Sequence, residues 1–404
     1  MQTNEMEFLE TAKKNKVLQS MMEIIGKRRD EIIAENKRDL DAFERDDQAL
    51  YDRLVVDQEK VDSMIKSIRE VKDQDDPVGN EISSITLDTG LEIINKTDPF
   101  GTIMIIYESR PDVTIEAAVL AFKANNKILL KGGREAYHSN VVLVKCWHEA
   151  LKENGLDESW IKMLELNREQ TQEFLRNPSE KLDLIVPRGG EKLIEFVKQH
   201  AKCAVLISGR GNNFLYVSPK ADWAKTVKVI INAKTDKISG CNALDKVLID
   251  KNIDAFNSKV EDLNEALSKL GVEVLVDQEV SKILSENSKI PSEDTWSEEF
   301  LAMKIVIGAI DSLDDAIERI NTYSGKHSSV IMTEDNDEAK KFMEQVDSAA
   351  VYQNASTRFT DGGQMGVGAE LAISTDKLHH RGPLGLKQLV TNKYYVFGDA
   401  HIRE

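Results

Sequence analysis

Residues 101–134 read GTIMIIYESRPDVTIEAAVLAFKANNKILLKGGR, and this stretch decides the fold class. An apolar run at Ile103–Tyr107 is followed by an amphipathic segment at Val113–Lys123 and by a second apolar run at Lys127–Leu130. A strand, a crossover helix and a second strand form the repeating unit of a parallel sheet. The stretch therefore predicts an α/β fold.

The same alternation continues on both sides of Cys241, so two α/β series follow one another along the chain. Two series predict two α/β domains with a cleft between them. The supporting segments are Ser139–Lys152, Leu182–Val186, Lys192–His200 and Ala204–Ile207 in the first series, and Ala243–Ile249, Ala255–Leu270, Val272–Val276, Met303–Ile307, Asp314–Tyr323, Ser328–Met332 and Glu338–Val346 in the second.

The composition limits the class of protein. The 404 residues leave room for two or three domains, with 41% hydrophobic and 30% charged residues. The net charge of −17, from 53 basic and 70 acidic residues, argues against nucleic acid and anionic membranes as partners. Three scattered cysteines predict neither a disulfide framework nor a metal site, and no segment has the character of a signal peptide or membrane span. We therefore expect a cytoplasmic protein.

The two ends of the chain carry smaller features. Residues 1 to about 72 have a helical apolar period and are expected to pack as helices on the outside of something larger. The stretch Ile82–Ile94 alternates apolar and polar residues around Asp88–Gly90, which indicates a hairpin. Near the end, Tyr394–Phe397 forms a last apolar run.

Cys241 is the first candidate for chemistry. It follows Ser239 and Gly240 in a loop, whereas Cys146 and Cys203 fit better as small core residues. Nearby cations favour the nucleophilic thiolate, and Lys234 and Lys237 lie just upstream. Taken alone, a loop cysteine is structural more often than catalytic.

Polar residues also follow three predicted strands, where ligands of a parallel sheet bind. Tyr107–Pro111 and Lys131–Arg134 end two strands, and Pro187–Glu191 ends a third and opens a helix whose amides favour a phosphate. The full dinucleotide fingerprint and a Walker lysine are absent, and solvated turns are the alternative. The polar run Asn354–Gly363 fits recognition of a small polar substrate, with a solvated loop as its alternative.

Five motifs together resemble the gamma-glutamyl phosphate reductases, a family within the aldehyde dehydrogenase superfamily. The resemblance covers nearly the whole chain in collinear order. It also includes the stretch Gly368–Gly385. The motifs are IIYESRPDVT at 105–114, LKGGREAYHSN at 130–140, VPRGGE at 186–191, NAKTDKISGCNAL at 232–244 and DSAAVYQNASTRFTDGG at 347–363.

The resemblance implies an aldehyde dehydrogenase-like fold and NADPH-dependent reduction of L-glutamate 5-phosphate to glutamate 5-semialdehyde, the second step of proline biosynthesis. It places Cys241 as the nucleophile that forms a thioester, with Ser109 and the backbone amide of Cys241 holding the oxyanion. The cofactor residues it implies are Lys131 on the adenosine ribose, Arg134 on the 2′-phosphate, Arg188, Gly189 and Gly190 near the pyrophosphate, and Glu299 on the nicotinamide ribose.

The substrate side follows from the same resemblance and from charge. Arg110 and Arg358 can each hold a carboxylate or phosphate bidentately, with Asn354 and Phe359 in the polar loop. Hydrolytic relatives carry a glutamate before two glycines, where this chain reads Ser208–Gly211, so the thioester should resist water. The chain departs from the family pattern at four positions: Asn213, Phe214, Asp245 and Ala302.

The expected domains are an NADP-binding domain at 1–233, to which 366–392 returns, and a catalytic domain at 234–365. The segments 80–97 and 393–404 are expected to form a small β oligomerisation element, and the protein is expected to be a homo-oligomer. Glutamate kinase is a candidate partner. Two alternatives stay open: another acyl reductase of the superfamily, and a non-catalytic dinucleotide-binding relative.

Overall fold

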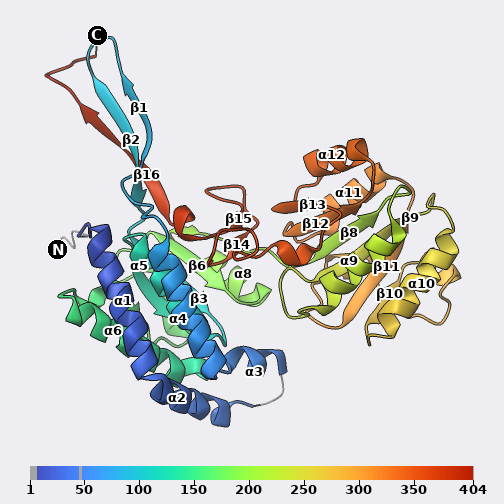
Figure 1. Ribbon diagram of the computed structural model, residues 1–404, viewed down its shortest axis with the longest axis horizontal. Helices are drawn as coiled ribbons and strands as arrows, with labels where there is room; N and C mark the ends of the chain where they lie inside the picture. The colour runs from blue at the N-terminus through green and yellow to red at the C-terminus, as the bar shows by residue number, and fades with distance from the viewer. Residues whose placement is uncertain (1–6, 45–47, 404) are drawn as a thin grey trace. The chain divides into compact units, whose positions relative to one another are not determined.

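The computed structural model describes residues 7–44 and 48–403, and the chain divides into two compact units (Figure 1). The first unit runs to Ile207 and also takes in Gly366–Ala372 and the chain from Leu384 onward. The second unit contains Ser208–Met365 and Ile373–Pro383. Each unit holds a parallel sheet with crossover helices, so the predicted α/β class with two domains is confirmed.

Within the described residues, the first unit is built on a parallel sheet of five strands in the order β5-β4-β3-β6-β7. The central strand β3 is buried at every residue but its first, as expected for a strand with layers packed on both faces. The strands are β3 (Thr102–Tyr107), β4 (Lys127–Lys131), β5 (Ile161–Met163), β6 (Leu184–Arg188) and β7 (Ala204–Val205).

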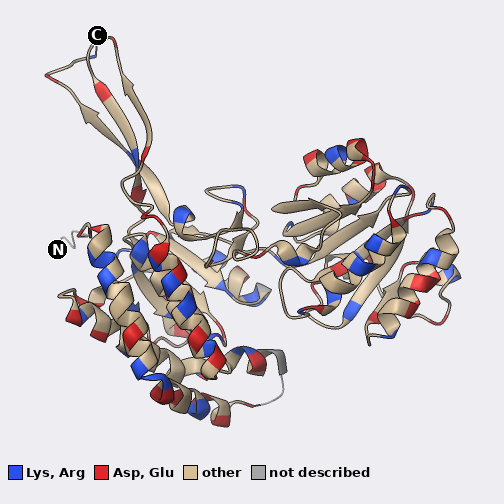
Figure 2. Ribbon diagram, viewed as in Figure 1, with Lys and Arg blue, Asp and Glu red and all other residues tan. Residues whose placement is uncertain are grey.

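Helix α5 connects β3 to β4 and is buried on nearly every side, because α1 and α4 pack against it from outside. It begins at Pro111, whose fixed φ and missing N–H suit the first helical position. Lys, Arg, Asp and Glu residues recur along the outer helices α1, α2 and α4 (Figure 2). The helices are α1 (Thr11–Lys27), α2 (Arg29–Ala42), α3 (Gln48–Leu54), α4 (Gln58–Asp73), α5 (Pro111–Lys123), α6 (Tyr137–Glu153), α7 (Arg168–Arg176) and α8 (Glu191–His200).

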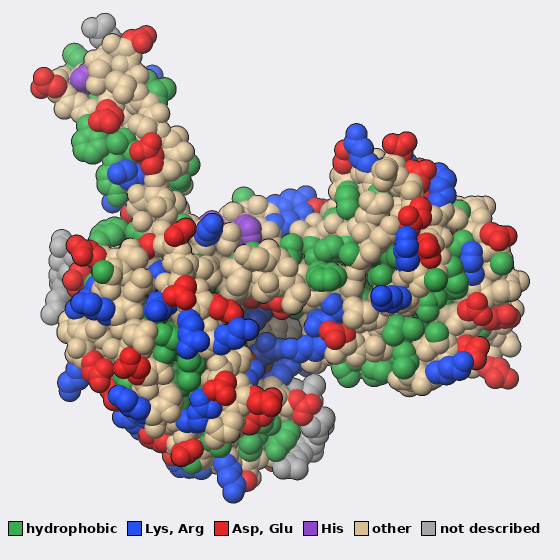
Figure 3. All heavy atoms as spheres, viewed as in Figure 1, with side chains coloured by type: hydrophobic (Ala, Val, Ile, Leu, Met, Phe, Trp, Pro, Cys, Tyr) green, Lys and Arg blue, Asp and Glu red, His purple; other side chains and the backbone are tan. Residues whose placement is uncertain are grey.

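An antiparallel arm belongs to the first unit. Strands β1 (Glu81–Thr86), β2 (Glu92–Pro99) and β16 (Val390–Phe397) form it, with β2 in the middle. The hairpin predicted around Gly90 is confirmed, and that glycine adopts a φ of 88° that other residues rarely accept. Hydrophobic side chains lie on the surface of the arm (Figure 3), and those more than half exposed are Ile82, Ile85, Tyr394, Val396 and Phe397.

Within the described residues, the second unit is built on a parallel sheet of six strands in the order β10-β11-β9-β8-β12-β13. Apolar clusters fill both faces of this sheet. The elements are β8 (Asn213–Val217), α9 (Trp223–Thr235), β9 (Leu244–Asp250), α10 (Phe256–Ser268), β10 (Glu273–Val276), β11 (Lys304–Ile310), α11 (Leu313–Tyr323), β12 (Ser328–Met332), α12 (Asn336–Gln345), β13 (Ala350–Gln353), and the short pair β14 (Ile373–Ser374) and β15 (Gly382–Pro383).

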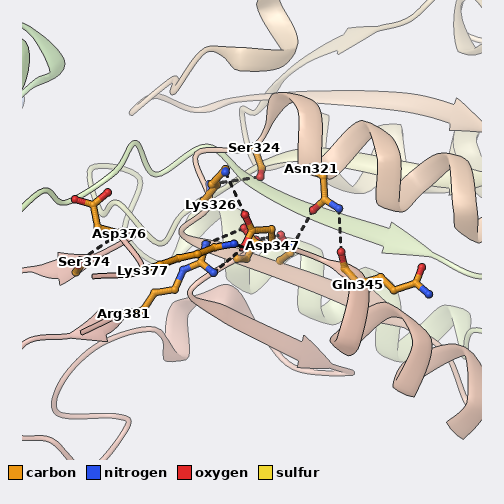
Figure 4. Close-up of polar contacts among 11 residues, drawn as sticks. Asn321, Ser324, Lys326, Gln345, Asp347, Ser374, Asp376, Lys377 and Arg381 are labelled. Atoms are coloured by element: carbon orange, nitrogen blue, oxygen red, sulfur yellow. Dashed lines mark hydrogen bonds and ion pairs between the residues drawn. The ribbon is translucent and has the colours of Figure 1, made fainter. Parts of the chain in front are cut away.

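Asp347 ties the β14–β15 segment to the second unit (Figure 4). Its carboxylate meets Arg381 at 2.7 Å, Lys377 at 3.1 Å and Lys326 at 3.1 Å. Arg381 also donates to the backbone carbonyl of Asp347 at 3.0 Å. Hydrogen bonds from Arg381, followed by those from the two lysines, hold the pKa of Asp347 well below its usual range. One carboxylate therefore anchors a segment that lies far from it in sequence.

The boundary between the units differs from the one expected at residue 233. Residues 208–233 belong to the second unit because β8 pairs with both β9 and β12 of its sheet. The second α/β series thus begins with β8, before Cys241. The expected return of 366–392 is interrupted as well, since Ile373–Pro383 packs in the second unit.

Candidate active site

Cys241 lies in the loop that leads from α9 into β9, and its side chain is half-buried. Two backbone hydrogen bonds close the turn around it: Gly240 N–H to the Lys237 carbonyl at 3.1 Å, and Ala243 N–H to the Gly240 carbonyl at 3.0 Å. The carbonyl of Cys241 accepts a hydrogen bond from the Asn213 side chain at 2.8 Å. The thiol therefore stands on a loop that is held from several sides.

Gly211 lets a second segment approach this loop closely. A Cβ atom at Gly211 would overlap with the carbonyl oxygen of Cys241, so a larger residue would force the loop aside. The same Cβ would lie 2.5 Å from a carboxylate oxygen of Glu299, which accepts the Gly211 N–H. Burial raises the pKa of Glu299. The structure thus brings Glu299, predicted as a cofactor residue, to the segment before β8 that approaches the nucleophile loop.

Arg358 braces the residue after Cys241. Its Nε donates to Asp236 at 2.9 Å, and its guanidinium also donates to the side-chain oxygen of Asn242. The amide of Asn242 donates to the Thr360 carbonyl at 2.9 Å. Arg358 was expected to bind substrate, and the structure adds an anchoring role that the sequence did not suggest. The neighbouring Phe359 is about half exposed.

The expectation that Lys234 supplies a cation to the thiol is not supported. Lys234 is fully buried and forms an ion pair of 2.8 Å with Asp245, which is also buried. Burial lowers the pKa of Lys234. The charge of Lys234 is neutralised by Asp245 inside the core. The ion pair therefore connects the two sides of the loop and does not act on the sulfur of Cys241.

The other two cysteines lie in the first unit. Cys146 is fully buried, and burial raises its pKa to about 12. Cys203 is half-buried, and burial raises its pKa as well. Both thiols are therefore protonated at neutral pH, as the interpretation of them as small core residues requires.

A cavity of about 720 Å³ lies in the first unit at the carboxyl ends of β3 and β4. Its lining includes three of the predicted residues: Ser109, Lys131 and Arg134. Burial lowers the pKa of Lys131, whose ammonium donates to the Gly132 carbonyl at 2.7 Å. The wall also carries two further cations and apolar side chains, which are Arg168, Lys192, Leu166, Leu193 and Phe196.

Two carboxylates that the sequence analysis did not single out lie at this cavity. Glu135 accepts both the backbone N–H of Ser109 at 2.7 Å and its hydroxyl at 2.8 Å. Ser109 has a positive φ of 40°, a conformation that this pair of bonds stabilises. Glu108 accepts the N–H of Gly190 at 3.2 Å, at the start of α8. Their signal in the sequence was only their position beside the strand-end motifs.

Arg110 and Arg188 lie close enough in the first unit for their charges to interact. Arg110 directly precedes α5, and Arg188 ends β6, next to Gly189. Burial lowers the pKa of Arg110, and the charge of Arg188 adds to that effect. Burial raises the pKa of Glu116, on α5 nearby, to about 7. This pair of guanidinium groups is suited to an anion.

Asn354 is placed differently from what was expected. Its side chain accepts the Thr333 N–H at 3.0 Å and donates to the Thr333 carbonyl at 2.8 Å. Asn354 therefore joins the ends of β12 and β13, and its φ of 52° fits an asparagine. To contact substrate as predicted, the Asn354 side chain would have to share the groups that bond to the backbone of Thr333.

Two properties of residues 7–44 and 48–403 bear on the type of site. None of their helices combines the length and the apolar character that crossing a bilayer demands. In the same part of the chain, no cluster of three or more His, Cys, Asp or Glu side chains is arranged to hold a metal ion.

Comparisons of the sequence with known proteins point to one family. The profile of the aldehyde dehydrogenase family matches residues 2–289. The chain is 44% identical to a gamma-glutamyl phosphate reductase of Thermotoga maritima over 98% of this chain and 95% of that one. It is 43% identical to a protein of the same name from Caldicellulosiruptor bescii, over 97% and 94% of the two chains.

Two solved structures are similar to this chain. The crystal structure of gamma-glutamyl phosphate reductase from Thermotoga maritima superposes with a TM-score of 0.92 at 42% identity, covering 98% of this chain and 95% of that one. An acetylating aldehyde dehydrogenase from Geobacillus thermoglucosidasius, at 18% identity and a TM-score of 0.70, shares the fold over 98% and 94% of the two chains.

Proposed function

The chain belongs to the aldehyde dehydrogenase family, and from this membership we propose that it reduces L-glutamate 5-phosphate to L-glutamate 5-semialdehyde with NADPH, releasing phosphate in the second step of proline biosynthesis. The observation that carries the proposal is the braced loop of Cys241, next to the stretch Ser208–Gly211, which contains no carboxylate. Such a site can form a thioester, and the stretch Ser208–Gly211 supplies no carboxylate to activate water. The nearby carboxylate of Glu299 accepts the Gly211 N–H and is assigned to the cofactor below.

In the proposed reaction, the Cys241 thiolate attacks the acyl carbon, the C–O bond to phosphate breaks, and phosphate leaves. A nicotinamide cofactor bound in the first unit would supply the hydride that the thioester carbon accepts. Breaking of the C–S bond then gives the aldehyde and returns Cys241 to the thiolate. We assign the stabilisation of the negative oxygen to the backbone amide of Cys241 and to Ser109.

The cavity of the first unit fits a phosphorylated dinucleotide in its chemistry. Its cations can meet phosphate groups, and its apolar wall can cover an adenine ring. We assign Lys131 to the adenosine ribose, Arg134 to the 2′-phosphate of NADP, and the amides around Gly189 and Gly190 to the pyrophosphate. Arg188 is also assigned to the pyrophosphate, and Glu299 to the nicotinamide ribose.

The substrate carries a carboxylate and a phosphate, which call for cations. Arg110 and Arg358 are assigned to them, because guanidinium groups bind both anions bidentately. Asn354 and Phe359 complete the proposed substrate site. By the same reasoning the first unit is the cofactor domain and the second the catalytic domain.

The exposed apolar side chains of the arm suit contact with another copy of the chain, so we assign the arm to homo-oligomerisation (Figure 3). Glutamate kinase is the candidate protein partner, since its product is the unstable acyl phosphate that this enzyme would consume. The cytoplasm, where that kinase and NADPH meet, is the expected location.

The reverse reaction provides the decisive test. With glutamate semialdehyde and NADP, we expect NADPH formation to require inorganic phosphate and to be restored by arsenate. Water without a general base forgoes about 10²- to 10⁴-fold in rate. Cys241→Ser should abolish the reaction both with phosphate and with arsenate. A rate that is independent of phosphate would identify a hydrolytic aldehyde dehydrogenase and overturn the proposal.

A further inference from the structure

Asn213, at the start of β8, is fully buried, and its side chain is surrounded by backbone groups. Its amide nitrogen lies 2.8 Å from the carbonyl oxygen of Cys241, 2.7 Å from that of Ala243 and 2.9 Å from that of Gly211. Its side-chain oxygen accepts the N–H of Ser328 on β12 at 3.0 Å. One side chain therefore joins three separate segments of the second unit.

The contacts lie where the sheet is irregular. In the pairing of β8 with β9, Asn213 lies opposite Leu244 and Phe214 lies opposite Lys246, so Asp245 has no partner across the ladder. Such a bulge breaks the ladder and leaves backbone groups to be satisfied in another way. The two protons of the Asn213 amide are shared among the three carbonyls, which belong to residues just before β8 and β9.

We propose that Asn213 is the positioning residue of the nucleophile loop, and this inference rests on the proposed role of Cys241. Its amide fixes the carbonyl of Cys241, and with it the peptide plane that follows the nucleophile. Through the Ala243 carbonyl it also fixes the exit of the loop into β9. These two anchors hold the backbone on the C-terminal side of Cys241, and this restricts the direction of its thiol.

A positioning role predicts a particular pattern of kinetic effects. An attacking atom that is misplaced by about 1 Å can cost on the order of 10²-fold in rate. Asn213 contacts the backbone of the loop and does not line the cationic cavity. Substrate and cofactor affinity should therefore change little. We therefore expect the loss in kcat, with KM nearly unchanged.

The neighbouring residue is a matched control. Asn212 is also an asparagine and also fully buried, and its amide donates to the carbonyls of Trp296 at 2.7 Å and Tyr323 at 2.9 Å. Neither carbonyl belongs to the Cys241 loop. Removing either side chain should cost similar stability, but only one removal should disturb the nucleophile.

The experiment compares Asn213→Ala, Asn213→Asp and Asn212→Ala in the full-length protein. Asn213→Asp keeps the size and the acceptor for Ser328, but an ionised carboxylate cannot donate to the three carbonyls. In the phosphate-dependent assay we expect kcat to fall at least tenfold in both Asn213 variants, with KM changed less than threefold. Asn212→Ala should keep kcat within threefold of the wild type. Equal losses in Asn212→Ala and Asn213→Ala would overturn the assignment.

A second measurement does not depend on the substrate. We expect iodoacetamide to alkylate Cys241 at pH 7 at least threefold more slowly in Asn213→Ala, because the surrounding amides no longer keep the orientation that favours the thiolate. Cys203 serves as the internal standard, and Asn212→Ala should match the wild type. An unchanged or faster rate in Asn213→Ala would contradict the inference. If the wild type lacked reductase activity but the alkylation rates still differed as expected, the proposed function would fail while the role of Asn213 would stand.

Discussion

Lys234 and Asp245 form a buried ion pair of 2.8 Å that spans the nucleophile loop, with one partner before Cys241 and the other after it. The second oxygen of Asp245 accepts the N–H of Phe300 at 2.8 Å. Asp245 is the bulge residue of β9, and the bulge turns its side chain toward the lysine. The loop therefore stands between two fixed points in the core.

Breaking this pair should be costly, because either partner alone leaves a buried charge. We expect Asp245→Asn to lower the free energy of unfolding of the second unit by about 3–5 kcal/mol. Urea denaturation followed by tryptophan fluorescence measures the loss. The control is Glu334→Gln, which removes an exposed partner of Lys225 and should change the stability little. Similar losses in both variants would contradict the prediction.

The three thiols should differ sharply in reactivity. Burial keeps Cys146 and Cys203 protonated at pH 8, whereas Cys241 lies in the braced loop. We expect iodoacetamide to label Cys241 at least ten times faster than either, and NADPH to change that rate. Mass spectrometry of labelled peptides follows each site, and Cys241→Ser should remove the fast phase. Equal labelling of all three thiols would refute the assignment of the nucleophile.

Gly211→Ala tests the close approach beside the nucleophile. The added methyl group would displace the Cys241 carbonyl, so we expect a loss of about 1–3 kcal/mol in stability together with most of the activity. Gly26→Ala, in α1, is the matched control, since nothing lies within 4 Å of a Cβ placed there. That variant should be as stable as the wild type or more so. Full activity in Gly211→Ala would show that the loop can move freely.

Cofactor preference should depend on Arg134. If its guanidinium meets the 2′-phosphate, Arg134→Ala should weaken NADPH binding by about 1.5–3 kcal/mol and leave NADH binding nearly unchanged. Isothermal titration with both cofactors measures this difference. Arg38→Ala, a surface arginine paired with Glu35, is the control and should alter neither affinity. An equal loss for both cofactors would place the 2′-phosphate elsewhere.

The cluster around Asp347 should make stability depend on pH. Its pKa lies below the value of about 4 expected in the unfolded chain, so its contribution is present above pH 4 and is lost as the pH falls further. We expect Asp347→Asn to cost about 1.5–3 kcal/mol at pH 7 and progressively less toward pH 3. Denaturation at both pH values checks this. Asp311→Asn, which removes an exposed partner of Lys251, should show a small difference at either pH.

The strands and helices with a clear apolar period could be predicted from the sequence. Ile103–Tyr107 and Val113–Lys123 correspond to β3 and α5, because burial on both faces requires continuous apolar residues. The short strand β8 was missed, since its polar first residue Asn213 hides its start. The role of Asn213 depends on the carbonyls of Cys241 and Ala243 and on the N–H of Ser328, all of which lie far away in the sequence.

Only part of the candidate site could be predicted from the sequence. Resemblance located Cys241, but the partners of Lys234 and Asn354 depend on the fold and could not be inferred from spacing. The carboxylate of Glu135 was missed for the same reason. Long-range hydrogen bonds leave little trace in local sequence patterns.

The pairing of β2 with β16 affects the order in which the protein folds during synthesis. The central strand of the arm, β2, pairs with β16, which follows the whole second unit in the sequence. The side chain of Asn126 donates to the Leu389 carbonyl at 2.8 Å. The second unit is complete once Pro383 has been added. Although domains generally fold in the order of translation, the unit that the ribosome begins first here is the one finished last. During synthesis, β2 therefore keeps one unpaired edge until β16 has been made.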